Sequence, residues 1–79
     1  MIYCNLVSSN EQLAVYNFGM DIDDLSGSVI FYKDSNEPEV TKLPEEGEKV
    51  LPWLQKLNVR HRKDFSQGIF KDKISYECG

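Results

Sequence analysis

The 79-residue chain has few of the residues from which metal centres and redox sites are built. It contains two cysteines, Cys4 and Cys78, and one histidine, His61, with no C-x-x-C spacing and no cluster of these residue types. Zinc sites and dithiol redox motifs need such clusters. We therefore expect no metal ion and no cofactor, with both thiols reduced in a cytoplasm. Pairing of the two end strands could still bring the sulfurs close enough for a disulfide in an oxidising buffer.

Long hydrophobic runs are also absent. No uninterrupted apolar run exceeds the four residues of Val29–Tyr32, whereas a membrane-spanning helix needs roughly 20. The first residues lack the basic and then apolar pattern of a signal peptide. The sequence thus predicts a cytoplasmic protein with no membrane partner.

The composition does not resemble that of a disordered chain, which combines low apolar content with high net charge. Hydrophobic residues make up 41% of the sequence and aromatic residues 11%. A chain of this length forms one core and buries about 60% of the surface that its unfolded form exposes. No repeat or low-complexity linker divides it, so we predict a single domain over residues 1–79.

Four β-strands are predicted in the first part of the chain. The segments Ile2–Val7 and Gln12–Phe18 alternate in character, and their short connection favours an antiparallel hairpin. Ser28–Lys33 is rich in β-branched and aromatic residues, and its continuous apolar run indicates a central strand with both faces at least partly covered. A short fourth strand is expected over Glu39–Leu43.

One helix is predicted over Glu48–Phe65. Five side chains follow the spacing of one helical stripe, namely Val50, Leu54, Leu57, His61 and Phe65. Proline is tolerated in the first turn, so Pro52 sets the start of the hydrogen-bonded helix near Leu51. Gly68 is expected to end it.

A last strand over Ile74–Cys78 completes the order β-β-β-β-α-β. This order predicts an α+β fold, an antiparallel sheet of about five strands with one helix packed on one face. We place the last strand beside the first, at an edge of the sheet.

Three carboxylates, Asp21, Asp23 and Asp24, lie between Gly19 and Gly27 and invite a calcium interpretation. The EF-hand pattern fails when Asp21 is taken as its first position. Leu25, Ser26 and Tyr32 then stand where an oxygen ligand, a glycine and a bidentate glutamate belong. We interpret the segment as a solvated loop with local backbone hydrogen bonds and one of its two glycines at positive φ.

No spacing in the sequence supplies a nucleophile, a base and an orienting acid together. His61 lies on the apolar helix stripe near the C-terminal end of the helix, where a partly buried packing role is more common than catalysis. We therefore predict that the protein is not an enzyme.

The aromatic residues give the leading functional prediction. One helix covers only one face of a five-stranded sheet, so some aromatic rings must lie on the other face, and exposed aromatics are typical of protein-binding surfaces. The candidate partner-binding residues are Tyr3, Tyr16, Tyr32 and Trp53. We expect a non-enzymatic interaction domain that binds another protein, or a second copy of itself, through an exposed sheet face or edge.

The alternative is nucleic-acid binding. Residues 1–48 carry ten acidic and two basic side chains, whereas residues 49–79 carry three acidic and seven basic ones, which together give the net charge of −4. Lys56, Arg60 and Lys63 share one face of the predicted helix, with Arg62 adjacent, a layout that could meet phosphates. On an acidic protein such residues more often form a solvated face, so we treat nucleic acid as the less favoured partner.

Several short motifs resemble a family. Residues 16–31 contain Y-N-F-G followed by D-L-S-G-S-V-I-F, Lys42–Glu45 follows, and Phe65–Phe70 reads F-S-Q-G-I-F. These segments resemble a group of small proteins of Gram-positive bacteria, a domain family of unknown function, with the patterns Y-x-[FY]-G…D-[DN]-L-x-G and F-x-x-G-x-F-P. The resemblance extends over roughly two-thirds of the chain, and Lys71 stands where the pattern has proline. It implies a bacterial cytoplasmic domain and carries no activity to any residue.

Overall fold

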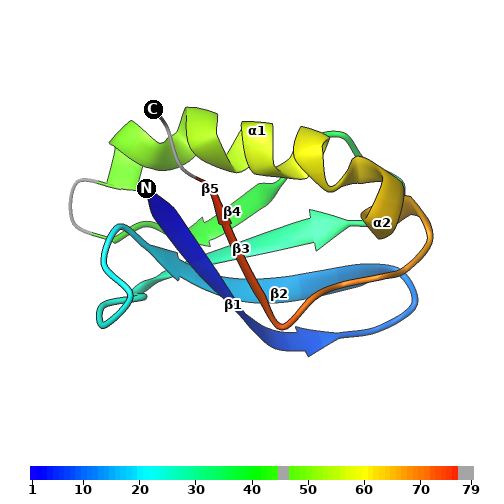
Figure 1. Ribbon diagram of the computed structural model, residues 1–79, viewed down its shortest axis with the longest axis horizontal. Coiled ribbons are helices and arrows are strands. Elements are labelled where there is room, and N and C mark those ends of the chain that lie inside the picture. Colours follow the sequence, from blue (N-terminus) through cyan, green and yellow to red (C-terminus); the bar gives the residue numbers. More distant parts are fainter. Residues whose placement is uncertain (45–46, 77–79) are drawn as a thin grey trace.

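The computed structural model describes residues 1–44 and 47–76. Its strands form one antiparallel sheet in the order β4-β3-β2-β1-β5, with bounds β1 Ile2–Ser9, β2 Leu13–Gly19, β3 Gly27–Tyr32, β4 Glu39–Lys42 and β5 Lys73–Tyr76. Helix α1 (Leu51–Arg60) lies across one face of the sheet, and no described element covers the other face (Figure 1). The predicted α+β fold and its β-β-β-β-α-β order are confirmed.

The first hairpin is closed by Asn10. Its side-chain Oδ1 accepts hydrogen bonds from the backbone N–H of Gln12, at 2.7 Å, and of Leu13, at 3.0 Å. Such local bonds are why asparagine favours turns. The pairing of β1 with β2 shifts between Leu6 and Ser8, which leaves Val7 in a bulge.

The last strand pairs with the first, as predicted. Ile2 lies opposite Tyr76 and Asn5 lies opposite Lys73, so β5 forms one edge of the sheet. The predicted strand extended to Cys78, which lies outside the described residues together with any contact between the two cysteines.

The third strand is an inner strand between β2 and β4, as predicted, and its two faces are buried to different degrees. The centre of the sheet is β2, and the side chains of β3 alternate between buried Val29 and Phe31 and half-buried Ile30 and Tyr32. The apolar run is continuous because the side chains on the second face of β3 are also apolar, although no described helix packs over that face.

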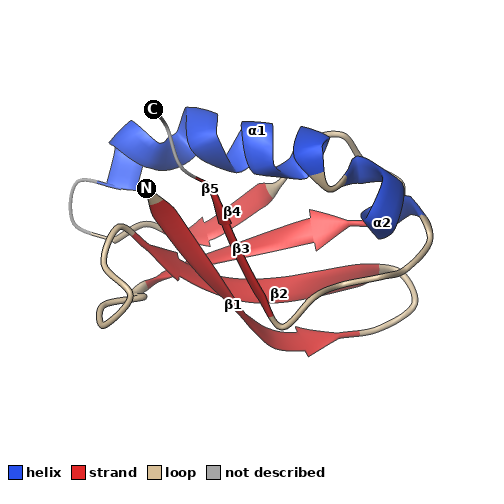
Figure 2. Ribbon diagram, in the orientation of Figure 1, coloured by secondary structure: helices blue, strands red, loops and turns tan. Residues whose placement is uncertain are grey.

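The helical segment starts where Pro52 predicts, but it is not one helix. A 3-10 turn, η1 (Gly47–Val50), precedes α1, and a second short helix, α2 (Arg62–Ser66), follows it (Figure 2). His61 adopts φ −101° and ψ 12° between α1 and α2. The weak helix formers Asn58 and Val59 precede this break, which turns α2 so that Phe65 packs into the core.

The end of α2 is a Schellman motif. Gly68 has φ 75°, its N–H bonds to the Phe65 carbonyl at 2.9 Å, and the Ile69 N–H bonds to the Asp64 carbonyl at 2.9 Å. These two bonds satisfy carbonyls that the helix leaves free. Gly68 therefore ends the helical segment, as the sequence predicts.

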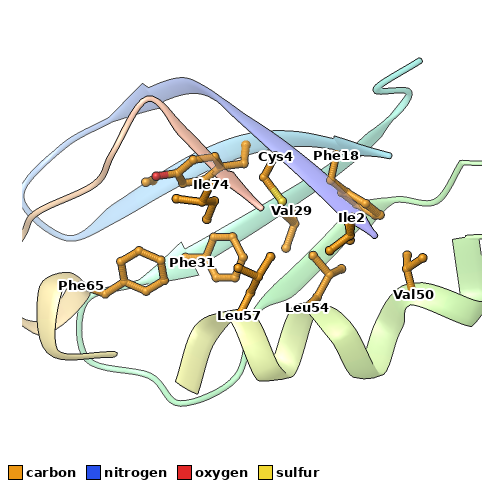
Figure 3. Packing of buried hydrophobic residues seen from close by; sticks show 12 residues of the cluster. Ile2, Cys4, Phe18, Val29, Phe31, Val50, Leu54, Leu57, Phe65 and Ile74 are labelled. Atoms are coloured by element: carbon orange, nitrogen blue, oxygen red, sulfur yellow. The ribbon is translucent and has the colours of Figure 1, made fainter. Parts of the chain in front are cut away.

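The core lies between the sheet and the helices. Leu54 and Leu57 of α1 point towards the strands, and Phe31 and Phe65 lie close together, with ring centroids 5.1 Å apart (Figure 3). The buried apolar residues are Ile2, Cys4, Ala14, Tyr16, Phe18, Val29, Phe31, Val50, Leu54, Leu57, Phe65 and Ile74. The strand members of this set come from alternate positions, so the opposite set of side chains faces away from the helix.

Candidate functional site

The face of the sheet opposite α1 carries only uncharged side chains on its three inner strands. Eight of them are half-buried: Tyr3 and Asn5 of β1, Leu13, Val15 and Asn17 of β2, and Ser28, Ile30 and Tyr32 of β3. We call these eight residues the open face. Their position follows from strand alternation, because their neighbours in sequence fill the core.

Strand register divides the open face into a polar row and an apolar patch. Asn17 lies opposite both Asn5 and Ser28, and the Ser28 hydroxyl donates to Asn17 Oδ1 at 3.3 Å. In the next rows Val15 lies opposite Ile30, and Leu13 lies opposite Tyr32. The apolar patch of Leu13, Val15, Ile30 and Tyr32 is therefore continuous across β2 and β3.

Charged side chains of this face lie on the edge strands. Glu39 of β4 lies opposite Ile30, and Lys42 lies opposite Ser28. At the other edge, Lys73 of β5 lies opposite Asn5. The Tyr32 hydroxyl donates to Glu39 Oε2 at 2.7 Å, and this hydrogen bond raises the pKa of Tyr32. An uncharged centre with charges at its border is the usual composition of protein interfaces.

The four aromatic candidates are divided between the two sides of the sheet. Tyr3 and Tyr32 lie on the open face, whereas Tyr16 is 0% exposed in the core and Trp53 packs against the core from α1. Tyr16 lies on the same face of β2 as Ala14 and Phe18. This face is the more apolar one, and that is the sequence signal that predicts a buried Tyr16. The accessible set on the open face therefore contains two of the four predicted residues.

The four basic candidates do not share one surface. Arg62 turns towards the chain that follows β3, where its guanidinium donates to the carbonyls of Tyr32 (2.9 Å), Lys33 and Ser35. Lys56 and Arg60 line a groove beside β5, and Lys63 is exposed in α2, beyond the break at His61. The break separates side chains that a continuous helix would have aligned.

The acidic loop between β2 and β3 is held by its own backbone. Asp21 accepts from the Asp23 N–H through Oδ1 at 3.0 Å and from the Asp24 N–H through its carbonyl at 2.9 Å. A Cβ at Gly19 would lie 2.1 Å from the Asp24 carbonyl oxygen. The expectation of a positive φ at Gly19 or Gly27 is wrong, because close approach and not φ requires these glycines. Among residues 1–44 and 47–76, no three His, Cys, Asp or Glu side chains are grouped as in a metal site.

The two remaining reactive candidates are packing residues. The His61 ring stacks on Phe65 with centroids 5.7 Å apart, and burial, with Lys71 nearby, lowers the pKa of His61. Burial raises the pKa of the Cys4 thiol to about 12. A thiol with this pKa is protonated at neutral pH, when only a thiolate is an effective nucleophile.

The described helices include none that is long and apolar enough to cross a membrane. No protein-family model matches the chain, and neither the curated proteins nor the solved structures include a significant match. The resemblance to a Gram-positive family therefore stays a prediction.

Proposed function

We propose that the protein is a non-enzymatic interaction domain whose open face packs against the open face of a second copy. One observation carries this proposal: the eight residues of the open face are uncharged and half-buried, while the charges of this face lie on the edge strands. Interfaces are depleted in charge at their centre in the same way.

Two open faces can pack about a two-fold axis. A two-fold axis that lies along β2, in the plane between two stacked sheets, places each copy's β4 over the β5 of the other copy. Strand register puts Lys42 of β4 and Lys73 of β5 in one row, through Ser28, Asn17 and Asn5. In this arrangement Lys42 of one copy lies over Lys73 of the other, and the repulsion between like charges keeps the dimer weak.

The area of the sheet predicts a reversible dimer. Five strands about 4.8 Å apart, with about five residues each at about 3.3 Å per residue, give a face of about 400 Å². Two such faces bury less than the roughly 1,200 Å² at the lower end of stable complexes. We therefore expect self-association in the upper micromolar to millimolar range.

Sedimentation equilibrium between micromolar and millimolar concentration tests this proposal. The wild-type mass should rise from monomer to dimer, and Ile30→Lys should remain a monomer because it places a charge at the centre of the apolar patch. Ile30→Thr, which keeps a β-branched residue in the strand, should weaken the dimer without altering the circular dichroism spectrum. Val59→Lys on α1, on the other side of the sheet, is the matched control and should associate like the wild type. A wild-type monomer at millimolar concentration would contradict the proposal.

A further inference from the structure

A groove of about 660 Å³ lies between α1 and the edge strand β5. It is lined by Pro52, Gln55, Lys56, Val59, Arg60 and Tyr76, and we call it the α1–β5 groove. Figure 1 shows α1 passing above β5, which is the last strand on this side of the sheet. The groove therefore lies where one further strand would extend the sheet beneath the helix.

The outer edge of β5 presents free backbone groups. The Leu6 N–H donates to the Asp72 carbonyl at 2.7 Å, and hydrogen-bonded pairs alternate along an antiparallel ladder. By this alternation Ile74 and Tyr76 direct their backbone groups towards β1, whereas Lys73 and Ser75 direct theirs outwards. No strand in the described part of the chain pairs with that edge.

The side chains of the groove combine an apolar surface with two cations. Val59 is 70% exposed, and Tyr76 is half-buried against the core. Lys56 and Arg60 lie one turn apart on α1, and the Arg60 guanidinium carbon lies 5.8 Å from the centroid of the Tyr76 ring. Neither cation forms an ion pair with any residue for which the structure gives a position.

We propose that the α1–β5 groove binds an extended, acidic segment of a partner protein, which adds to β5 as a sixth strand. Side chains alternate along a strand, so an apolar residue and an acidic residue two positions apart face the helix together. The apolar side chain then contacts Tyr76 and Val59, and the carboxylate reaches Lys56 and Arg60. This site uses none of the open face and does not depend on self-association.

The backbone of β5 favours a peptide over a nucleic acid. Lys73 and Ser75 each offer one N–H donor and one carbonyl acceptor, and another strand pairs with both. A phosphodiester accepts hydrogen bonds but cannot donate, so the carbonyls would stay unpaired.

The test is a titration of the ¹⁵N-labelled protein with the blocked peptide Thr-Val-Thr-Glu-Thr-Val-Thr. We expect amide shifts at Val59, Lys73 and Ser75, with slower hydrogen exchange at Lys73 and Ser75. The same peptide with Lys in place of Glu should bind about fivefold to tenfold more weakly. Single-stranded oligothymidine is the third probe and should leave these amides unchanged.

Three exposed substitutions locate the site. Lys56→Gln combined with Arg60→Gln should weaken the acidic peptide about tenfold, and Val59→Glu should abolish binding by placing a carboxylate in the groove. Lys63→Gln, on α2, should bind like the wild type. No peptide binding at millimolar concentration, shifts confined to β4 or the open face, or oligothymidine shifts at Lys73 and Ser75 would each overturn the proposal.

Discussion

Tyr16 links the core to the connection that leads into the last strand. Its ring packs edge-on against Phe31 with centroids 5.5 Å apart, and its hydroxyl donates to the Lys71 carbonyl at 2.6 Å. The next residue, Asp72, accepts from the Leu6 N–H. These two bonds fix the point at which β5 begins to pair with β1.

We expect Tyr16→Phe to lower the free energy of unfolding by about 1 kcal/mol, because the Lys71 carbonyl loses a buried donor. Burial raises the pKa of Tyr16 to about 12 from an ordinary value of 10.0. Above pH 10 the unfolded chain therefore loses this proton while the folded chain keeps it, so the stability from Tyr16 falls as the pH rises. Urea unfolding of both proteins from pH 8 to pH 12 should show that the stability advantage of the wild type over Tyr16→Phe falls above pH 10. An advantage that rises with pH would contradict this assignment.

Two glycines give a contrast between conformational strain and steric clash. Gly68 has φ 75°, and a Cβ added there would have nothing within 4 Å, whereas at Gly19 that atom would lie 2.1 Å from the Asp24 carbonyl oxygen. Gly68→Ala should cost about 1–2 kcal/mol from the left-handed backbone alone. Gly19→Ala should cost more, since the loop must move, and thermal unfolding should rank it as the less stable variant. Equal losses of stability in the two variants would show that the loop moves to accept the added Cβ at little cost.

At the scale of elements, Arg62 joins α2 to the segment that follows β3. Its guanidinium donates to the carbonyls of Tyr32, Lys33 and Ser35, and it also contacts Asn58 Oδ1 at 3.5 Å. These contacts connect the helical layer to the β3–β4 side of the sheet. The residue acts as a structural clamp in the folded chain.

We expect Arg62→Met, which keeps the aliphatic stem, to lower the free energy of unfolding by about 2 kcal/mol, because three carbonyls lose a charged donor. Lys63→Met is the matched control, with an exposed side chain and an expected change within about 0.5 kcal/mol. Urea unfolding followed by Trp53 fluorescence measures both. Two variants of equal stability would show that the hydrogen bonds of Arg62 do not stabilise the fold.

Sequence periodicity predicts most of the elements because alternation and the 3.6-residue repeat are local properties. Pro52 correctly predicts that the helix starts at Leu51, and Gly68 correctly predicts where the helical segment ends. Sequence periodicity misses the break at His61, which depends on how Phe65 reaches the core, and it misses the burial of Asn58, which is 0% exposed beside Arg62. Both depend on contacts between segments far apart in the chain.

At the scale of the whole molecule, the structure has one covered face, one open face and one edge beside a helix. Alternation places Tyr3 on the open face, but the sequence does not show that Leu13, Val15, Ile30 and Tyr32 form one patch, because that requires the register of β2 against β3. The α1–β5 groove likewise combines residues from two elements that meet only in the fold. Sites of this kind depend on strand order, which no local pattern encodes.

The most direct test of self-association through the open face is a mixture of ¹³C-labelled and unlabelled protein at millimolar concentration. Isotope-filtered NOE spectra report only contacts between different copies. We predict intermolecular NOEs among the methyl groups of Val15 and Ile30 and the ring of Tyr32, which lie in adjacent rows of the apolar patch. Their absence, or intermolecular NOEs only from α1 residues such as Leu51 and Val59, would contradict association through the open face.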